Sequence, residues 1–263
     1  MSPTSTRAFT YPQPAALNYR DNAPFPHIVL PGAWDRDVVA QCKHEVSTYA
    51  GWEGQKDFYG SRKKRYCGDI EALPATVARV IHEASSPAFL RWLTELTGEQ
   101  ALMPDPYLEG GGIHSILQGG FLKVHADFNW NERLQLYRRL NVLLYLNPDW
   151  DPAWGGALEL WKQDMSECVT RVMPEAGTMV VFTTDDRSFH GHPHPTTTPE
   201  GVSRDSIALY FYSPIKPAVN FADKRIGTDY RPIAGDTEFA AWDSSLKGRV
   251  KNRIRKLLTP EKG

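Results

Sequence analysis

Hydrophobic residues follow two different patterns along this chain, at helical spacing in its first part and in short strand-like runs afterwards. In the first part, apolar residues recur at helical spacing after Asp35, Pro74 and Ser86. Asp and Ser favour the position that caps a helix N-terminus, and Gly98 is of the type that commonly follows a helix C-terminus. We therefore predict three helices here, preceded by a short apolar strand at 25–30.

Beyond residue 104 the apolar runs are short and are separated by Gly, Pro, Asn and Asp, which is the pattern of strands joined by turns. The strands that we predict lie at 105–109, 113–117, 120–125, 139–147, 157–162, 168–173, 178–183 and 205–213. Such a series of short strands is typical of a double-sheet jelly roll. A last helix is predicted at 236–258, because acidic residues come early in it and basic residues late, as the helix dipole favours.

The predicted class is α+β, with a double-stranded β-helix (jelly-roll, cupin-like) core flanked by N-terminal helices and a C-terminal helix. All of the chain is expected to form one domain with four regions. They are a flexible lead-in at 1–24, a helical support and substrate-loop region at 25–104, the β-helix core at 105–215 and a C-terminal extension at 216–263.

Composition narrows the classes of function. The chain has 263 residues, enough to bury a full core, and its net charge of −1 argues against a dedicated nucleic-acid or membrane-surface protein. Its three cysteines lie far apart and are odd in number, which suits a reducing cytosol and provides no disulfide framework. No apolar run approaches a membrane span, and the N-terminus lacks the apolar segment of a signal peptide. We therefore expect a cytoplasmic protein that binds neither nucleic acid nor membrane.

His125 and Asp127 are the first candidate metal ligands. They are separated by one residue at the end of a predicted strand, so their side chains project to one face, roughly 6.5–7 Å apart along the backbone. His190 ends a later strand, 65 residues after His125. Two histidines and one carboxylate leave coordination positions open, as in the facial triad of non-haem Fe(II) oxygenases.

Other histidines compete for the distal position. His192 and His194 lie in a Gly- and Pro-rich turn, whereas His190 directly follows the strand and is preferred. His114 is expected to be a core residue or to lie behind the ligands. A structural zinc is more often closed by four ligands, frequently cysteines, so the mixed ligand set favours Fe(II).

Arg204 and Ser206 are candidate anchors for an anionic co-substrate. They have the same parity on a late predicted strand, so both side chains project to one face. A guanidinium near the metal can hold a carboxylate through two hydrogen bonds, and the serine hydroxyl adds another donor. Tyr145 and Asn141 also share a parity, on the predicted strand 139–147. Tyr145 is a candidate for the same carboxylate, with a buried core tyrosine as the alternative.

These motifs together resemble the 2-oxoglutarate-dependent Fe(II) dioxygenases, and among them the prolyl-4-hydroxylase-type branch. The stretch Tyr145-Leu-Asn-Pro-Asp-Trp-Asp151, followed by Gly155-Gly-Ala-Leu-Glu159, is similar to a region of the animal oxygen-sensing prolyl hydroxylases. The resemblance covers about 105–213 and implies that Tyr145 helps to bind the co-substrate. One departure is that Arg204 lies 14 residues after His190, farther than is usual in that branch, so the intervening loop must bulge away from the site.

The resemblance implies a site that uses Fe(II), 2-oxoglutarate and O2, with ascorbate as a candidate reductant. The residues implied are His125, Asp127 and His190 for the metal, and Arg204, Ser206, Tyr145 and Asn141 for 2-oxoglutarate. The expected reaction is hydroxylation of an unactivated C–H bond in a small amino-acid-like or natural-product molecule, releasing succinate and CO2. Related halogenases replace the carboxylate ligand by a small residue, so Asp127 favours oxygen insertion or desaturation over chlorination.

Other functions remain as alternatives. Within the same class, the protein could act as a peptidyl-prolyl 4-hydroxylase on another protein. Outside it stand a non-catalytic jelly-roll binding module, which would be expected to lose a ligand or the anchor, and a zinc hydrolase on the same scaffold. The sequence does not fix the oligomeric state.

Residues 52–67 are predicted to form a mobile flap over the substrate. The stretch is read as a long loop or loose hairpin, because it mixes aromatic residues with many polar ones. It also contains the basic run Arg62-Lys-Lys-Arg65, which would steer an acidic or carboxylate-bearing substrate into the site. The alternative is a solvated hairpin whose bases have no role in binding.

Overall fold

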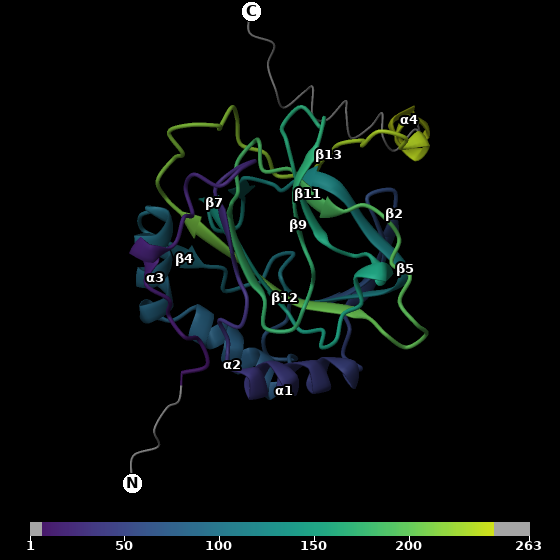
Figure 1. Cartoon of the computed structure of the whole chain (residues 1–263). Helices are drawn as coiled ribbons and strands as arrows, with labels where there is room; N and C mark the ends of the chain where they lie inside the picture. Colours follow the sequence, from purple (N-terminus) through teal and green to yellow (C-terminus); the bar gives the residue numbers. More distant parts are fainter. Residues whose placement is uncertain (1–6, 245–263) are drawn as a thin grey trace, which may run out of the picture.

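The computed structural model describes residues 7–244, in which a curled antiparallel sheet carries the three N-terminal helices on one side (Figure 1). Within that range the helices are α1 (Arg36–Ser47), α2 (Ala75–Ala84), α3 (Pro87–Thr97) and α4 (Thr237–Ser244), with short 3-10 turns at Pro14–Ala16 and Pro152–Trp154. None of the described helices is both long and apolar enough to cross a membrane.

Thirteen strands of the described residues belong to one sheet. They are β1 (His27–Leu30), β2 (Gly54–Phe58), β3 (Ser61–Cys67), β4 (Met103–Pro104), β5 (Gly112–Ala126), β6 (Trp130–Asn131), β7 (Leu136–Tyr145), β8 (Leu158–Trp161), β9 (Cys168–Val172), β10 (Met179–Thr183), β11 (His190–His192), β12 (Arg204–Ser213) and β13 (Asp229–Tyr230). The main order is β1-β10-β7-β12-β5-β11-β8-β9. Strand β5 joins the two halves, because its first part pairs with β12 and its last part with β11. The sheet is a nearly closed barrel, so the predicted double-stranded β-helix is confirmed.

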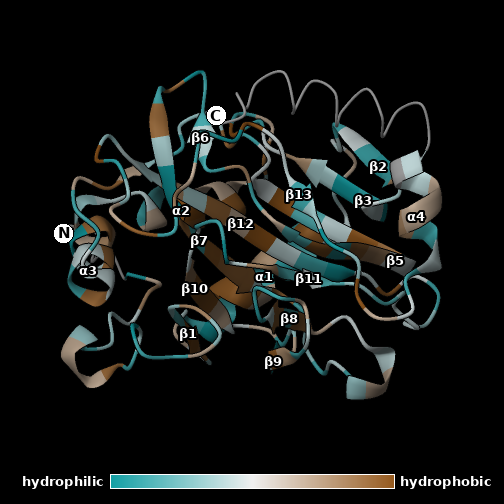
Figure 2. Cartoon of the chain, turned by 90° about the horizontal axis from the view of Figure 1, so that it is seen from above, coloured by the Kyte–Doolittle hydropathy of each residue, from teal (hydrophilic) through white to brown (hydrophobic). Residues whose placement is uncertain are grey.

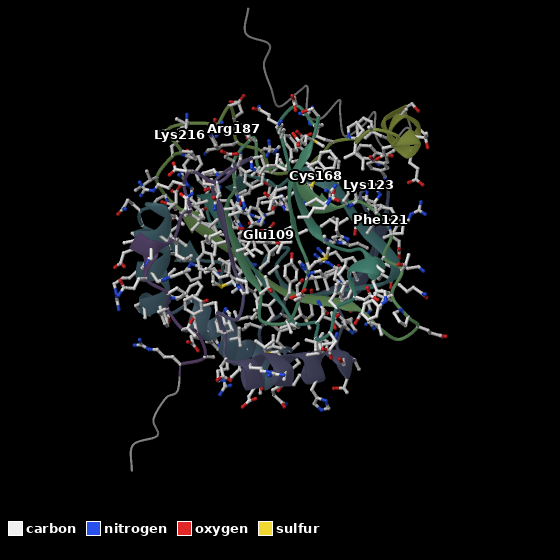
Figure 3. All side chains as sticks on the ribbon, viewed as in Figure 1. Glu109, Phe121, Lys123, Cys168, Arg187 and Lys216 are labelled. Carbon is white, nitrogen blue, oxygen red and sulfur yellow. The ribbon has the colours of Figure 1, made fainter. Side chains whose placement is uncertain are left out.

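Side chains alternate between the two faces of the central strands. On β7, for example, Leu140, Val142 and Leu144 belong to the core shared with the helices, whereas Leu143 and Tyr145 face the inside of the barrel. This is the period-two pattern of a strand that is covered on one side and encloses a site on the other. Figure 2 shows long hydrophobic stretches on β10 and β12, while β2 is largely hydrophilic. Side chains fill much of the space between the ribbons (Figure 3), so the barrel is a packed body around a limited cavity.

The three N-terminal helices form where the apolar spacing predicted them. The Asp35 carboxylate accepts hydrogen bonds from the first turn of α1, and the Ser86 hydroxyl accepts one from Phe89 in α3. Gly98 ends α3 in a left-handed conformation with φ of 81°. Their apolar faces pack on the outer face of β7, β10 and β12, so these helices support the sheet and line no part of the cavity.

The predicted strand at 105–109 is wrong. The Asp105 carboxylate accepts hydrogen bonds from the backbone of Tyr107 and Glu109, both at 2.9 Å, and holds this stretch as a turn after the short β4. The two strands predicted at 113–117 and 120–125 are a single one, β5. Near its middle, Gly119 takes a positive φ of 76°, so the strand bends there without ending.

Two terminal regions differ from the sequence-based picture. Much of the expected lead-in is packed, because Phe9 and Tyr19 are each only 2% exposed and Phe9 bridges to Trp34. The predicted C-terminal helix begins as α4 at Thr237, and its expected continuation from residue 245 lies outside the described residues.

Of the long loop and the loose hairpin predicted for residues 52–67, the structure has the hairpin. Strand β2 pairs with β3, and β3 pairs with β5 from Ser61 to Cys67, so the hairpin extends the main sheet. Helix α4 packs against the turn of this hairpin, where Trp242 stacks on Tyr59 with ring centroids 4.8 Å apart.

Candidate active site

The fold brings His125, Asp127 and His190 together although His190 is distant in the sequence. His125 lies near the end of β5 and pairs directly with His190 at the start of β11. Asp127 follows β5 immediately, and its carboxylate oxygens lie 3.4 Å from His125 Nε2 and 3.5 Å from His190 Nε2. One ligand atom from each residue lies within 4.8 Å of the others. This is the donor set of two imidazoles and one carboxylate that suits Fe(II).

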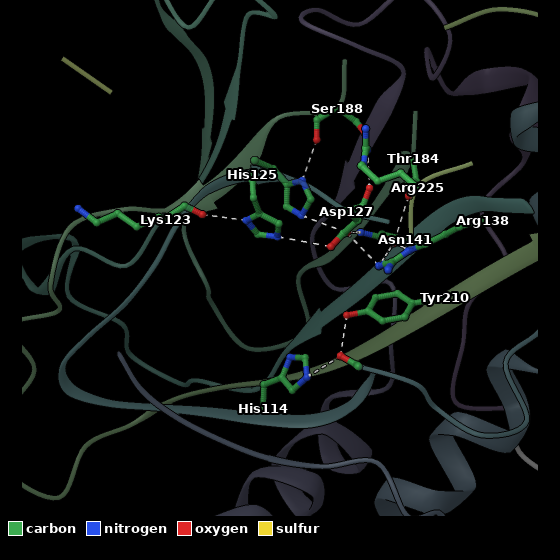
Figure 4. A network of polar contacts seen from close by, with 12 residues as sticks. His114, Lys123, His125, Asp127, Arg138, Asn141, Thr184, Ser188, Tyr210 and Arg225 are labelled. Atoms are coloured by element: carbon green, nitrogen blue, oxygen red, sulfur yellow. Dashed lines mark hydrogen bonds and ion pairs between the residues drawn. The ribbon is translucent and has the colours of Figure 1, made fainter. Parts of the chain in front are cut away.

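Backbone carbonyls fix the orientation of both histidines. His125 Nδ1 lies 2.8 Å from the carbonyl oxygen of Lys123, and His190 Nδ1 lies 2.9 Å from that of Ser188 (Figure 4). A carbonyl can only accept, so each Nδ1 carries the proton and each Nε2 is left as a lone-pair donor facing Asp127. Burial also lowers the pKa of His190 to about 4, which keeps this imidazole neutral and able to bind a metal.

Asp127 is held by two side chains from β7. Arg138 Nη2 donates to Asp127 Oδ2 at 2.9 Å, and Asn141 Nδ2 donates to the same oxygen at 2.8 Å. Burial alone would raise the pKa of Asp127, but Arg138 together with the nearby histidines holds it well below its usual value. The carboxylate is therefore ionised, fixed in place and suited to a cation.

The competing histidines are separated from this cluster. His192 is buried and lines the same cavity, yet its Nδ1 has no hydrogen-bond partner among the described residues, and it is not part of the ligand cluster. His194 is exposed. His114 is buried and its Nε2 donates to the carbonyl oxygen of Gly110 at 3.1 Å, so it lines the cavity away from the ligands.

Arg204 and Tyr145 lie in the same cavity as the three candidate ligands. Arg204 is 5% exposed, its Nε donates to the carbonyl oxygen of Gly156 at 2.6 Å, and its Nη2 donates to the hydroxyl of Tyr145 at 3.3 Å. Ser206 pairs in register with Tyr145 and also faces the cavity. A carboxylate placed here would meet a guanidinium and hydroxyl groups together.

The long loop before Arg204 bulges as the sequence required. Thr196 exchanges backbone hydrogen bonds with Gly119 and Gly120 on β5, at 2.8 and 3.0 Å. The loop is thereby fastened against the barrel wall, and β12 can begin at Arg204 with its side chain inside.

Asn141 lies in the cavity but not beside Arg204. It shares β7 with Tyr145, four residues away, which corresponds to roughly 13 Å along a strand. Its amide is bonded to Arg138 and Asp127, so the geometry places Asn141 at the metal end of the cavity. These contacts suit Asn141 to positioning Asp127 more than to contacting the carboxylate beside Arg204.

The cavity has a volume of about 280 Å³, and all seven residues singled out from the sequence line it. Sequence analysis missed two basic residues in its wall, Arg138 and Lys56, and it named Lys64 only as a member of the basic run 62–65. For Arg138 the signal was hidden because the pairing of β7 with β12 shifts its register between Arg138 and Leu140. A bulge reverses the alternation of faces, so parity counted along the strand gives the wrong side.

Comparisons with known proteins agree with this geometry. Residues 111–212 match the family described as the 2OG-Fe(II) oxygenase superfamily. Over these residues, fewer than half of the chain, the sequence is similar to that superfamily. The match spans β5 to β12 and so contains every one of the seven candidate residues. The predicted class, a 2-oxoglutarate-dependent Fe(II) dioxygenase, is thereby confirmed, as are the family's cofactors Fe(II), 2-oxoglutarate and O2.

A curated relative of this oxygenase is the prolyl 3-hydroxylase OGFOD1 of Xenopus laevis, which is 24% identical over 200 residues. The match covers 73% of this chain but only 36% of that protein, so the chain spans about a third of the relative's length.

Solved structures show that the fold is shared. A prolyl-4-hydroxylase from Pseudomonas putida superposes with a TM-score of 0.51 at 19% identity, covering 77% of this chain and 100% of that one. HygX from Streptomyces hygroscopicus, solved with nickel, 2-oxoglutarate and hygromycin B, gives a TM-score of 0.51 at 13% identity, covering 78% and 93%. At these identities the likeness concerns the fold alone, and the neighbours differ in what they bind.

Proposed function

We propose that this oxygenase hydroxylates an unactivated C–H bond of a small amino-acid-like or natural-product molecule, converting 2-oxoglutarate to succinate and CO2. The observation that carries the proposal is the single buried cavity that holds a complete ligand triad at one end and Arg204 with Tyr145 at another part of its wall. A non-catalytic binding module would have no need to keep both.

The residues fit Fe(II) because two neutral imidazole nitrogens and one fixed carboxylate converge on one point. His125, Asp127 and His190 would hold the metal, and Arg204, Ser206 and Tyr145 would bind the far carboxylate of 2-oxoglutarate. When bound, Fe(II) supplies the activation of O2 by which 2-oxoglutarate is decarboxylated and one oxygen atom enters the C–H bond.

The protein's own contribution is positioning and exclusion of water. The Asp127 carboxylate is held by Arg138 and Asn141, so it cannot swing away from the metal. The buried walls keep bulk water from the oxidising centre. A cavity of about 280 Å³ is near the lower end of volumes for small-molecule sites, roughly 300–1,000 Å³, which favours a small substrate.

A peptidyl proline is the second candidate substrate. The similarity to a prolyl 3-hydroxylase is the observation that favours it.

Variants of the two neighbouring histidines test the proposal. His190→Ala should abolish both Fe(II) binding and O2-dependent succinate formation, because it removes one of three ligands. His192→Ala should keep Fe(II) binding. Wild-type protein loaded with Fe(II) would be assayed for succinate with free L-proline, other free amino acids and a proline-containing peptide.

Three results would refute parts of this assignment. If His190→Ala retained iron and His192→Ala lost it, the distal ligand would be His192 and not His190. Turnover that needs no O2 would indicate a hydrolase. A chlorinated product in the presence of chloride would contradict oxygen insertion.

A further inference from the structure

Lys64 is a buried lysine in the wall of the active-site cavity. It pairs with Ile116 of β5, and Ile116 pairs with Arg204 of β12, so the three residues form one row across neighbouring strands. Directly paired residues project to the same face of a sheet, and Lys64 and Arg204 both line the cavity. Lys64 is only 9% exposed.

The other bases of the run at 62–65 are directed elsewhere. Arg62 Nη2 lies 3.8 Å from the carboxylate of Glu238 on the outside, and Lys63 Nζ donates to the carbonyl oxygen of Gln118 at 2.9 Å. Arg65 donates to Ser115 and lies over the ring of Trp52. The basic run is therefore not a cluster of four steering charges, because Lys64 alone points into the site.

Lys64 lacks an anionic partner of its own. Among the described residues that line the cavity, Asp127 is the one carboxylate, and it is already engaged by Arg138 and the two histidines. The Lys64 ammonium makes no hydrogen bond or ion pair with any described residue. Burying an unpaired ammonium group is unfavourable, and proteins normally place a partner beside it.

A second lysine increases the need for an anion. Lys56 lies directly opposite Lys64 in the β2–β3 pairing, is exposed, and also lines the cavity. Like charges directly opposite one another on a sheet are destabilising. Burial, followed by the charge of Lys56, lowers the pKa of Lys64 to about 7. A bound anion between the two ammonium groups would relieve this repulsion and favour the charged form.

Both carboxylates of 2-oxoglutarate have other partners in the proposed site, so neither is expected to pair with Lys64. One end of the co-substrate would be held at the metal by the triad, and Arg204, Tyr145 and Ser206 would bind its other end.

We propose that Lys64 binds a carboxylate of the prime substrate, and that this substrate is a small carboxylic acid such as a free amino acid. The inference rests on the proposed function and narrows it. An internal peptidyl proline has no carboxylate to offer, so Lys64 favours the free amino acid over the protein substrate. Exposed Lys56 would attract the anion to the mouth of the cavity.

Binding without turnover tests the inference. The protein, loaded with Mn(II) and 2-oxoglutarate in the absence of O2, would be titrated calorimetrically with free amino acids, including L-proline, and with their primary amides. Wild type should bind at least one acid about tenfold or more tightly than its amide, because a charge-assisted hydrogen bond contributes roughly 1.5–3 kcal/mol. Lys64→Met and Lys64→Gln should bind acid and amide equally. Lys63→Met, which changes an adjacent outward lysine, should retain the wild-type preference.

The affinity for 2-oxoglutarate separates the two possible sources of the carboxylate. Arg204→Met should weaken 2-oxoglutarate about tenfold or more, whereas Lys64→Met should leave it within about twofold of wild type. Equal weakening in both variants would assign Lys64 to the co-substrate and overturn the inference. A wild-type protein that binds none of the acids, or that binds acid and amide alike, would also overturn it. Failure of the proposed oxygenase reaction would be seen separately, as absence of succinate from the wild type.

Discussion

At the scale of single residues, the site depends on hydrogen bonds that the backbone makes to its ligands. His125 and His190 each donate from Nδ1 to a carbonyl oxygen two residues earlier in the chain. The same local arrangement at both positions leaves both Nε2 atoms free, whereas His192 has no such carbonyl. This difference explains physically why His190 is preferred over a histidine only two residues away.

Asn141 gives a residue-scale prediction. Asn141→Leu should lower the affinity for Fe(II) roughly 10–100-fold, because partners that orient a ligand typically contribute this much. Thr184→Val is the matched control, since Thr184 donates to Asn141 but does not touch Asp127. Anaerobic titration with Fe(II) measures the effect. Weaker 2-oxoglutarate binding with unchanged Fe(II) affinity would instead return Asn141 to the co-substrate site.

At the scale of elements, alternation along strands decided what the sequence could predict. Regular strands gave correct faces, so Arg204, Ser206 and Tyr145 were all placed on the cavity side. Arg138 was missed, because a register shift beside it reverses the alternation and local sequence carries no clear sign of a bulge. For the stretch 52–67 the sequence left a long loop and a loose hairpin open, because its polar side chains reflect a sheet edge and a cavity wall.

Gly191 gives a prediction at this scale. A Cβ at this position would lie 2.8 Å from the carbonyl oxygen of Leu122 and 2.9 Å from that of Lys123, both on β5. Gly191→Ala should therefore push β11 from β5 and separate His190 from His125, lowering Fe(II) affinity and succinate formation roughly tenfold or more. Gly227→Ala is the control, because no atom lies within 4 Å of a Cβ there. Equal metal affinities of the two variants would show that the strands can adjust.

At the scale of the whole molecule, stability and binding place opposite demands on one wall of the barrel. The helices pack on the outer face of the sheet and bury most of the apolar core, while the inner face carries charges at the site. Lys64 is the clearest case, because the residue is only 9% exposed and lies opposite the like-charged Lys56. The free energy of unfolding should therefore carry a measurable penalty from this residue.

Lys64→Met should stabilise the ligand-free protein in a pH-dependent way. The pKa of Lys64 is about 7 in the folded protein, against 10.5 for an ordinary lysine, chiefly through burial and then through Lys56. Arg204 and Arg138 add to this lowering, and Asp127 opposes it. Between these values the unfolded chain holds a proton that the folded chain has released, so stability rises with pH. The penalty is complete below pH 7 and disappears toward pH 10.5.

Thermal unfolding measures this effect. The melting temperature of Lys64→Met should exceed that of wild type by at least ~2 °C at about pH 6, and by clearly less at about pH 9. Lys63→Met should show no pH-dependent difference. A gain of equal size at both pH values would mean that Lys64 has an ordinary pKa in the folded protein.

The β2–β3 hairpin pairs with β5 but is separate in the sequence from the proposed metal and 2-oxoglutarate residues, so enzyme engineering could exchange it. The six residues proposed for the metal and 2-oxoglutarate lie between His125 and Ser206, whereas Lys56 and Lys64 reach the cavity from a separate stretch, 54–67. Strand β3 contacts the core sheet through β5, and β2 pairs with β3. Exchanging the hairpin would therefore redesign what the oxygenase selects while leaving the oxidising machinery in place.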